Sequence, residues 1–323
     1  MSKTLTEQTR HALNGPTMGT RWQAIFHAEQ GFDVQRLREA LQAAVTEVDV
    51  QMSTWKPYSD LMRLNSAPAG VWHPVPAHLM KVLQIALDIG RASGGAFDIG
   101  LGDVTTAWGF GPSEADPMRM RVALTADRVP AHDALRLDVD AGKVFKTASI
   151  TLDLNGIAKG YGVDRLAETL MEHGITSSLV GVDGEMRAMG LRPDGVAWTI
   201  AIEAPDTARR TPQSVLQLQE ASVATSGDYR HWVEVQGRKL SHTMAPQRGA
   251  PLLAAPASVT VVARSCAEAD GWATALMVLG LDKGRALAAH LRLDTLFLLR
   301  DAVGSIRGVG VGDLFSENPT AIS

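Results

Sequence analysis

The chain has 323 residues, of which 45% are hydrophobic and 20% charged, with a formal net charge of −4 and an isoelectric point near 6.1. This is the composition of a soluble globular protein with enough material for a core, and its slightly acidic balance argues against a nucleic-acid partner. The single Cys266 excludes an internal disulfide and indicates neither a zinc site nor a redox pair. We interpret it as a small buried residue.

The start of the chain lacks the apolar stretch of about 7–15 residues that marks a signal peptide. No run approaches the roughly 18 apolar residues of a membrane-spanning helix. The sequence as given therefore predicts a cytoplasmic protein, or a periplasmic or membrane-anchored one if a signal segment has been removed from its start.

Hydrophobic periodicity predicts short, mixed elements in the first half of the chain: a strand at 18–27, amphipathic helices at 34–50 and 77–92, a Pro- and Arg-rich loop at 111–132, and a strand at 144–152. A helix ending near Gly174 comes next. It is followed by strands at 178–182, 198–202, 215–223, 231–235 and 259–262, and by a helical pair at 268–279 and 283–291. Because strands and helices do not alternate regularly, we expect an α+β protein with antiparallel sheets and packed helices.

The segment 153–164, Asp-Leu-Asn-Gly-Ile-Ala-Lys-Gly-Tyr-Gly-Val-Asp, joins an apolar run to a helical pattern. Such a junction offers free N–H groups and the positive end of a helix dipole to a phosphate, and Lys159 adds a charge. Two structural alternatives remain open. The glycines serve only the turn, and Lys159 pairs with Asp153 or Asp164 instead of a phosphate.

Asp270 and Thr274 are four residues apart in a helical segment, so a carboxylate and a hydroxyl share one helix face. Oxygen ligands of this kind suit Mg²⁺, which completes its shell with water and phosphate oxygens. The structural alternative is an N-capping Asp270 with Thr274 bonded back to its own helix. Trp272, between them in sequence, points elsewhere by the helical period, and we interpret it as packing.

Three further segments carry polar groups in turns. Residues 94–100 combine paired glycines, which permit close backbone approach, with Asp98, and an aromatic pair at Trp108 and Phe110 follows. That pair suits either a planar ring or the core. Residues 225–229 add hydroxyls around a turn, and His242 in a loop-like stretch is the candidate general acid or base.

Taken in order, these segments resemble the ApbE-like flavin transferases, the FAD:protein FMN transferase family. The residues that carry the resemblance are Thr17-Met18-Gly19-Thr20, Met52-Ser53-Thr54-Trp55 with Ser59 and Asn65, Gly94-Gly95-Ala96-Phe97-Asp98, Trp108-Gly109-Phe110, Leu152 to Tyr161, Thr225-Ser226-Gly227-Asp228-Tyr229, Ser241-His242, and Ala269-Asp270 with Ala273-Thr274. The resemblance implies an N-terminal extension at 1–14, a family domain at 15–323, and FAD in a cleft between two subdomains.

The resemblance also implies an activity: Mg²⁺-dependent transfer of the FMN half of FAD to a Thr or Ser hydroxyl of an acceptor protein, with release of AMP. In this family the acceptors are redox membrane proteins. Asp270, the Thr274 hydroxyl and the Ala158 backbone carbonyl would hold Mg²⁺, and His242 would shuttle a proton or orient the phosphate. The implied flavin-nucleotide contacts are Met18, Gly95, Ala96, Phe97, Asp98, Asp153, Lys159, Thr225, Ser226, Gly227 and Asp228.

Two departures from the family pattern bear on this expectation. After His242 the usual Asp is Ala245 and the usual Arg is Gln247, with Arg248 one position on. If that Asp orients His242, its loss weakens catalysis by about one to two orders of magnitude. The usual Gly-Gly-Asp is Asp183-Gly184-Glu185 here, which adds a carboxylate.

Two other functions share the same motifs. In an FAD pyrophosphatase a metal-bound water replaces the acceptor hydroxyl and yields FMN and AMP. A non-catalytic flavin-binding protein would keep only the nucleotide contacts, but it would have little need for Asp270 and Thr274. The sequence identifies neither the acceptor nor the oligomeric state.

Overall fold

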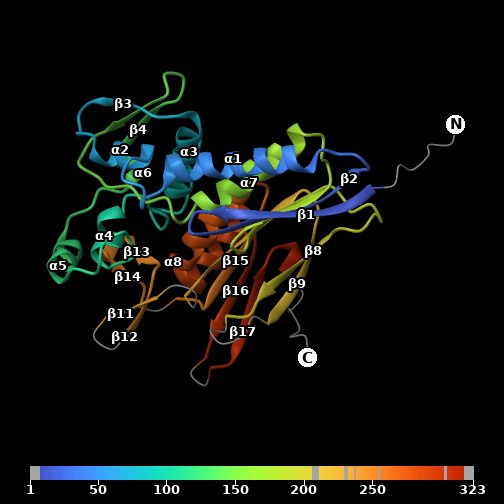
Figure 1. Cartoon of the computed structure of the whole chain (residues 1–323). Coiled ribbons are helices and arrows are strands. Elements are labelled where there is room, and N and C mark those ends of the chain that lie inside the picture. Colours follow the sequence, from blue (N-terminus) through green and yellow to red (C-terminus); the bar gives the residue numbers. More distant parts are fainter. Residues whose placement is uncertain are drawn as a thin grey trace.

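The computed structural model describes residues 8–205, 211–228, 232–235, 238–253, 255–301 and 304–315. Its centre is an eight-stranded sheet in which every neighbouring pair is antiparallel (Figure 1). Across the sheet the strands are β1 (Gln8–Thr17), β2 (Thr20–Glu29), β6 (Ser178–Val182), β7 (Glu185–Met189), β10 (Ala221–Gly227), β15 (Ser258–Ala263), β16 (Asp294–Arg300) and β17 (Ile306–Val311). The antiparallel sheet with packed helices confirms the predicted fold class.

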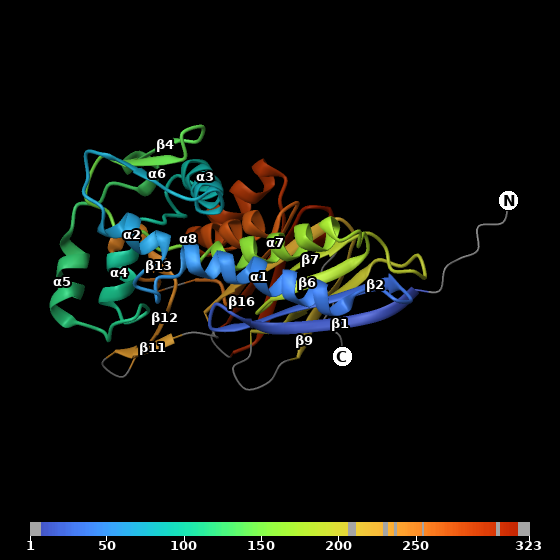
Figure 2. The same cartoon turned by 45° about the horizontal axis from the view of Figure 1, so that its top comes forward.

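One face of this sheet is covered by α1 (Val34–Met52), α7 (Ala158–Glu172) and α8 (Cys266–Leu291) (Figures 1 and 2). Side chains alternate between the two faces of a strand, so Trp22 and Phe26 of β2 are buried beneath the helices. Ile25 points the other way, toward a hairpin of β8 (Trp198–Glu203) and β9 (Pro212–Leu218) that covers the opposite face. Both faces of the sheet are therefore packed.

A second group of elements sits at one end of the main sheet (Figures 1 and 2). It contains α2 (Asp60–Ser66), β3 (Trp72–Pro74), α3 (Ala77–Ala92), α4 (Gly102–Ala107), α5 (Pro117–Thr125), α6 (Ala131–Ala134), β4 (Leu135–Asp138) and β5 (Lys143–Lys146). Beside it lie the short strands β11 (Trp232–Val235), β12 (Arg238–Ser241), β13 (Met244–Ala245) and β14 (Ala250–Pro251), with the single helical turn η1 (Pro246–Arg248) between the last two. A second single turn, η2 (Asp313–Phe315), follows β17 of the main sheet. Within the described residues no helix has the length and apolar character needed to cross a bilayer.

Most predicted helices are confirmed, including α3 at 77–92 and the final pair, which the structure joins through a non-helical Gly280. The predicted loop at 111–132 is wrong, because α5 and α6 form there. The predicted strand at 215–223 is two strands, β9 and β10, which meet at a turn where Glu220 has a φ of 49°. Residues 8–14, which the sequence assigns to an extension, form most of β1.

The strand predicted at 144–152 ends at Lys146, and the chain then runs irregularly to Leu152. This stretch has no neighbouring strand among the described residues. The side chain of Asn65, at the end of α2, makes the backbone hydrogen bonds that such a strand would make. Its amide donates to the Leu152 carbonyl at 2.9 Å, and its oxygen accepts from the Leu152 N–H at 2.7 Å. The buried Lys146 ammonium caps the same helix end on the carbonyls of Leu64 and Asn65. The turn at 153–157 therefore starts from a fixed point.

Asn65→Ala tests this clamp. The substitution leaves both backbone groups of the buried Leu152 without their partner, so we expect the free energy of unfolding to fall by about 1–3 kcal/mol in urea denaturation. Ser66→Ala removes an exposed hydroxyl bonded to its own helix, and it serves as the control with little expected change. Equal stability of the two variants would contradict the clamp.

Candidate functional site

The first turns of α7 and α8 meet at Gly160. A Cβ on Gly160 would lie 2.3 Å from the Cys266 carbonyl oxygen and 2.8 Å from the Asp270 Cβ, so only glycine permits this approach. The Gly160 N–H donates to Asp270 Oδ2 at 3.0 Å. Asp270 is 5% exposed, one turn inside α8. A buried carboxylate is therefore held at the start of α7.

The two helices cap each other. Asp164 of α7 accepts the N–H groups of Cys266 and Ala267, the first two residues of α8, at 2.9 Å each. Asp270 of α8 in turn accepts an N–H from the first turn of α7. These N–H groups have no partner inside their own helices, so each carboxylate satisfies a donor of the other helix and meets its positive dipole end.

The structural alternative for Asp270 is wrong. The α8 N-cap is Ser265, which forms a capping box with Glu268, so Asp270 lies inside the helix and does not cap it. Thr274 lies one turn further on, and its hydroxyl is 3.0 Å from the Ser226 hydroxyl on β10. Between them Trp272 packs in the core, as predicted. Asp270 and Thr274 thus share a helix face that borders α7 and β10.

Lys159 joins this group, but not through the predicted partners. Its ammonium lies 2.8 Å from Glu185 Oε1 and 3.5 Å from Asp183 Oδ2, while Asp164 pairs with Arg187 at 2.6 Å. Pairing of Lys159 with Asp153 or Asp164 is therefore wrong. Burial alone lowers the Lys159 pKa, but the charges of Glu185 and Asp270 outweigh it and hold the pKa above its ordinary value.

The carboxylates around Lys159 outnumber its single charge. Burial raises the pKa of Asp270 to about 7, and the Glu185 charge adds to the shift while Lys159 and the Gly160 N–H oppose it. Glu185 is 4% exposed, and its Oε2 atom has no hydrogen-bond partner among the residues that the structure describes. Such a site favours an added cation.

The donor set fits Mg²⁺ by its chemistry. A buried carboxylate, a hydroxyl and the first carbonyls of α7 are hard oxygen donors, the kind that this cation takes alongside water and phosphate oxygens. In the described part of the chain, no three His, Cys, Asp or Glu side chains form a complete metal site. A cation here therefore needs backbone oxygens as well, together with oxygens from solvent or substrate.

The predicted turn at 94–98 packs directly on this group. Phe97, which is 4% exposed, and Thr274 both lie against Gly156. A Cβ atom at Gly156 would be 3.2 Å from each of these two side chains. Gly94 and Gly95 both have positive φ, which explains the glycine pair. Asp98 accepts the N–H group of Gly100 in its own loop and the N–H group of Ala131 at the start of α6. Ala96 is buried beside it.

Met18 and Asp153 both lie in turns. Met18 occupies the β1–β2 turn with a φ of 44°, and its methyl group lies against Gly162 of α7. Asp153 accepts the Thr105 hydroxyl of α4 at 2.9 Å and the Asn155 N–H at 2.7 Å. Asp153 therefore fixes its own turn and joins it to α4.

The predicted turn at 225–228 forms the end of β10. Thr225 pairs its hydroxyl with Thr260 of β15 at 2.8 Å, and Ser226 pairs with Thr274. Gly227 ends the strand opposite Ser258. Asp228 lies 3.3 Å from Arg300. Tyr229, the last residue of this motif, is outside the described residues.

His242 lies just beyond β12, and α4 ties its neighbourhood to the Asp153 turn. The Phe110 ring contacts the His242 ring edge to face, with centroids 6.4 Å apart. Trp108 Nε1 donates to the Gly249 carbonyl at 3.0 Å, and Gly249 has a φ of 56° in the tight turn between β13 and β14. Ala245, at the position of the family's Asp, is buried and pairs with Ala250.

Sequence reasoning missed the roles of Glu185, Asp164 and Arg187. The Asp-Gly pair before Glu185 was a usable signal, because a two-residue Asp-Gly hairpin loop starts a new strand at the next residue. Asp183 and Gly184 both have positive φ, as such a loop requires. The partners of Glu185 and Asp164 are distant in sequence, so only the fold reveals them.

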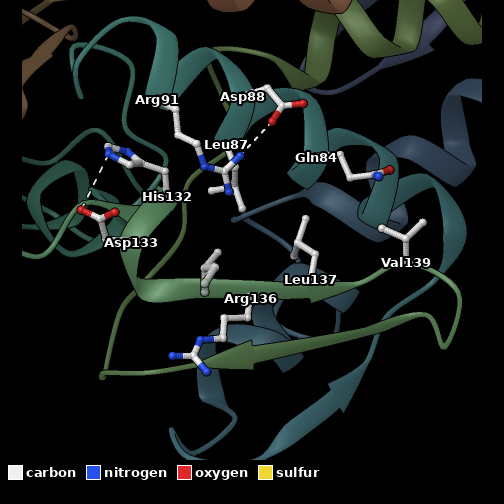
Figure 3. Close-up of a pocket in the computed structure, with 10 residues that line it drawn as sticks. Gln84, Leu87, Asp88, Arg91, His132, Asp133, Arg136, Leu137 and Val139 are labelled. Atoms are coloured by element: carbon white, nitrogen blue, oxygen red, sulfur yellow. Dashed lines mark hydrogen bonds and ion pairs between the residues drawn. The ribbon is translucent and has the colours of Figure 1, made fainter.

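A separate cavity of about 490 Å³ lies between α3 and β4 (Figure 3). Its charged side chains already pair with one another: Arg91 with Asp88 at 2.8 Å, and His132 with Asp133 at 3.8 Å. In Figure 3 the Arg136 head group points away from the space above β4. No predicted site residue lines it, so this cavity is not the candidate site.

Gly160→Ala tests the helix approach, with Gly162→Ala as the matched control on α7. Alanine favours a helix by about 1 kcal/mol over glycine at either position. At Gly160 the new Cβ meets backbone, whereas at Gly162 it meets only the end of Met18. We expect Gly160→Ala to lose about 1–3 kcal/mol of stability in urea denaturation and Gly162→Ala to lose nothing. The reverse order would contradict the packing described.

The Asp270 pKa predicts a pH dependence in protein stripped of divalent cations. Its carboxyl has an ordinary pKa of 3.8 and a folded pKa of about 7, so the folded state binds its proton more tightly. The contribution of Asp270 to stability is then present at acid pH and is lost as pH rises through about 7. We expect Asp270→Asn to gain stability relative to the parent between about pH 4 and pH 7 in denaturation series. A pH-independent difference would contradict the shift.

The geometry can be compared with known proteins. The ApbE family model matches residues 18–297. An FAD:protein FMN transferase of Vibrio cholerae serotype O1 is 35% identical over 294 residues, covering 89% of this chain and 87% of that one. The Escherichia coli (strain K12) protein of the same name is 33% identical over 282 residues, 84% of this chain and 79% of its own.

Two solved structures are also similar to this chain. The flavin transferase ApbE from Vibrio cholerae has a TM-score of 0.84 at 31% identity, covering 97% of this chain and all of its own. The apo flavinyl transferase ApbE of Pseudomonas stutzeri also has a TM-score of 0.84, at 34% identity, covering 98% and 99%. This chain belongs to the ApbE family.

Proposed function

We propose that this protein is a Mg²⁺-dependent FAD:protein FMN transferase. The acceptor is a Thr or Ser hydroxyl of another protein, of the redox membrane class. Its oxygen forms a bond to the phosphorus of the FMN half, the bond from that phosphorus to the bridging oxygen breaks, and AMP leaves with that oxygen. The hydroxyl proton is released. The names of the relatives support flavin transfer to a protein.

The observation that carries the proposal is the convergence of Asp270, Thr274 and the α7 start. In the proposed site the Asp270 carboxylate, the Thr274 hydroxyl and the Ala158 carbonyl hold the cation. A bound Mg²⁺ neutralises charge on the pyrophosphate during displacement at phosphorus. The dipole of α7, whose positive end lies at this start, favours the same anion. Excess carboxylate charge around Lys159 supports a cation at this position.

The FAD lies, in this proposal, in a cleft between the main sheet with its helices and the group of elements around α3 and α4. Met18, the turn 95–98, Asp153, Lys159 and the turn 225–228 border it. Several of these groups are held by neighbouring side chains: Asp153 binds Thr105, Ser226 binds Thr274 and Lys159 binds Glu185. In this proposal these bonds fix the cleft walls before the nucleotide arrives, which lowers the ordering cost of binding.

His242 acts on the proton of the acceptor hydroxyl or orients the reacting phosphate. Phe110 packs against its ring, and Trp108 holds the following turn through Gly249. These contacts fix the loop in which the family's Asp is replaced by Ala245. The proposal therefore keeps His242 active despite this replacement.

The direct test is mass spectrometry of an acceptor domain carrying a Thr flavinylation motif, incubated with the protein, FAD and Mg²⁺. We expect a covalent FMN adduct and one AMP per adduct, both abolished by EDTA. Asp270→Ala should slow adduct formation at least about 100-fold, since a metal supplies several kcal/mol of charge stabilisation. Asp88→Ala, on the exposed face of α3, is the control and should react at the parental rate.

The other products separate the alternatives. Release of FMN and AMP without adduct on any acceptor would replace the transferase with an FAD pyrophosphatase. FAD bound without turnover would indicate a flavin-binding protein. Either result contradicts the proposal.

A further inference from the structure

Glu185 is a buried carboxylate that has no role of its own in the proposed reaction. It is the first residue of β7, directly after the two-residue turn of Asp183 and Gly184. The turn and the pairing of Val182 with Glu185 fix its backbone. Its side chain reaches Lys159 at the α7 start, where Oε1 accepts from the ammonium at 2.8 Å.

The second oxygen of this carboxylate sets Glu185 apart from an ordinary ion-pair partner. Oε2 is buried and has no hydrogen-bond partner within the described part of the chain, and the whole residue is 4% exposed. A buried polar atom without a partner is costly, and a charged one more so. The structure therefore contains an acceptor that an incoming donor would satisfy.

The unpartnered oxygen belongs to the surroundings of Asp270. Glu185 and Asp270 both bind the first turn of α7, Glu185 through the Lys159 ammonium at 2.8 Å and Asp270 through the Gly160 N–H at 3.0 Å. The single charge of Lys159, 2.8 Å from Glu185, cannot neutralise both carboxylates. A dication with its own water molecules would supply both the missing charge and a hydrogen-bond donor.

We propose that Glu185 is part of the cation site, and that Oε2 accepts a hydrogen bond from a water molecule carried by the divalent cation at Asp270. This inference rests on the proposed function, because it assumes the cation. Contact through water agrees with the absence, among the described residues, of a site built from three acidic or imidazole ligands. Groups that orient a metal's ligands typically contribute about 10–100-fold to its affinity.

The competing explanation is that Glu185 only anchors Lys159. The two roles of Glu185 can be separated, because the Lys159 ammonium only donates hydrogen bonds and therefore pairs with the oxygen of a glutamine amide and not with its NH₂ group. In Glu185→Gln the amide oxygen faces Lys159, and the NH₂ group replaces Oε2. That variant keeps the anchor but presents a donor where the cation's water needs an acceptor.

The experiment is Mn²⁺ titration by electron paramagnetic resonance, which counts free Mn²⁺, on flavin-free protein. Four proteins are compared: the parent, Lys159→Met, Glu185→Gln and the double variant, in which the pair is replaced by two neutral side chains. We expect Glu185→Gln to weaken Mn²⁺ binding at least about tenfold both with and without Lys159. Glu268→Gln removes a carboxylate from the first turn of α8, bonded to Ser265, and should leave the affinity unchanged.

The outcomes distinguish this inference from the proposed function. An effect of Glu185→Gln that vanishes in the Lys159→Met background would show an anchoring role only and would overturn the inference. Unchanged affinity in all Glu185 variants would also overturn it, while leaving the cation at Asp270. Asp270→Ala binding Mn²⁺ as tightly as the parent would instead overturn the cation site of the proposed function. Circular dichroism melts confirm that each variant is folded before titration.

Discussion

The candidate site depends on the reciprocal capping of α7 and α8. Each helix contributes a buried carboxylate to the first-turn N–H groups of the other: Asp164 to Cys266 and Ala267, and Asp270 to Gly160. The exchange works only because Gly160 has no side chain. It offsets part of the cost of burying two charges, and it holds Asp270 against the first turn of α7.

The surrounding elements extend this arrangement outward. β7 contributes Glu185 to Lys159 and Arg187 to Asp164, so one strand holds both helix starts. β10 contributes Ser226 to Thr274, and α4 joins the Asp153 turn to the loop of His242. The large antiparallel sheet therefore acts as a rigid base for a site built at helix ends, a common way to hold a phosphate.

Local patterns in the sequence predicted much of this. Periodicity located α1, α3, α7 and α8, and the one-turn spacing of Asp270 and Thr274 put them on one face. In the main sheet β1, β7, β16 and β17 went unpredicted, because whether a segment forms a strand depends on the packing that it finds in the folded sheet. The partner of Lys159 was not among the alternatives that the sequence left open, because Glu185 is 26 residues away and reaches it only through the fold.

The proposed function requires a divalent cation at the junction of α7 and α8. The most direct measurement is anomalous diffraction from crystals containing Mn²⁺ and FAD, collected at the manganese edge. The account predicts one strong peak beside the Asp270 carboxylate and the Thr274 hydroxyl, with the Ala158 carbonyl and FAD phosphate oxygens in its shell. A fully occupied manganese peak elsewhere, with FAD bound and none at Asp270, would contradict it.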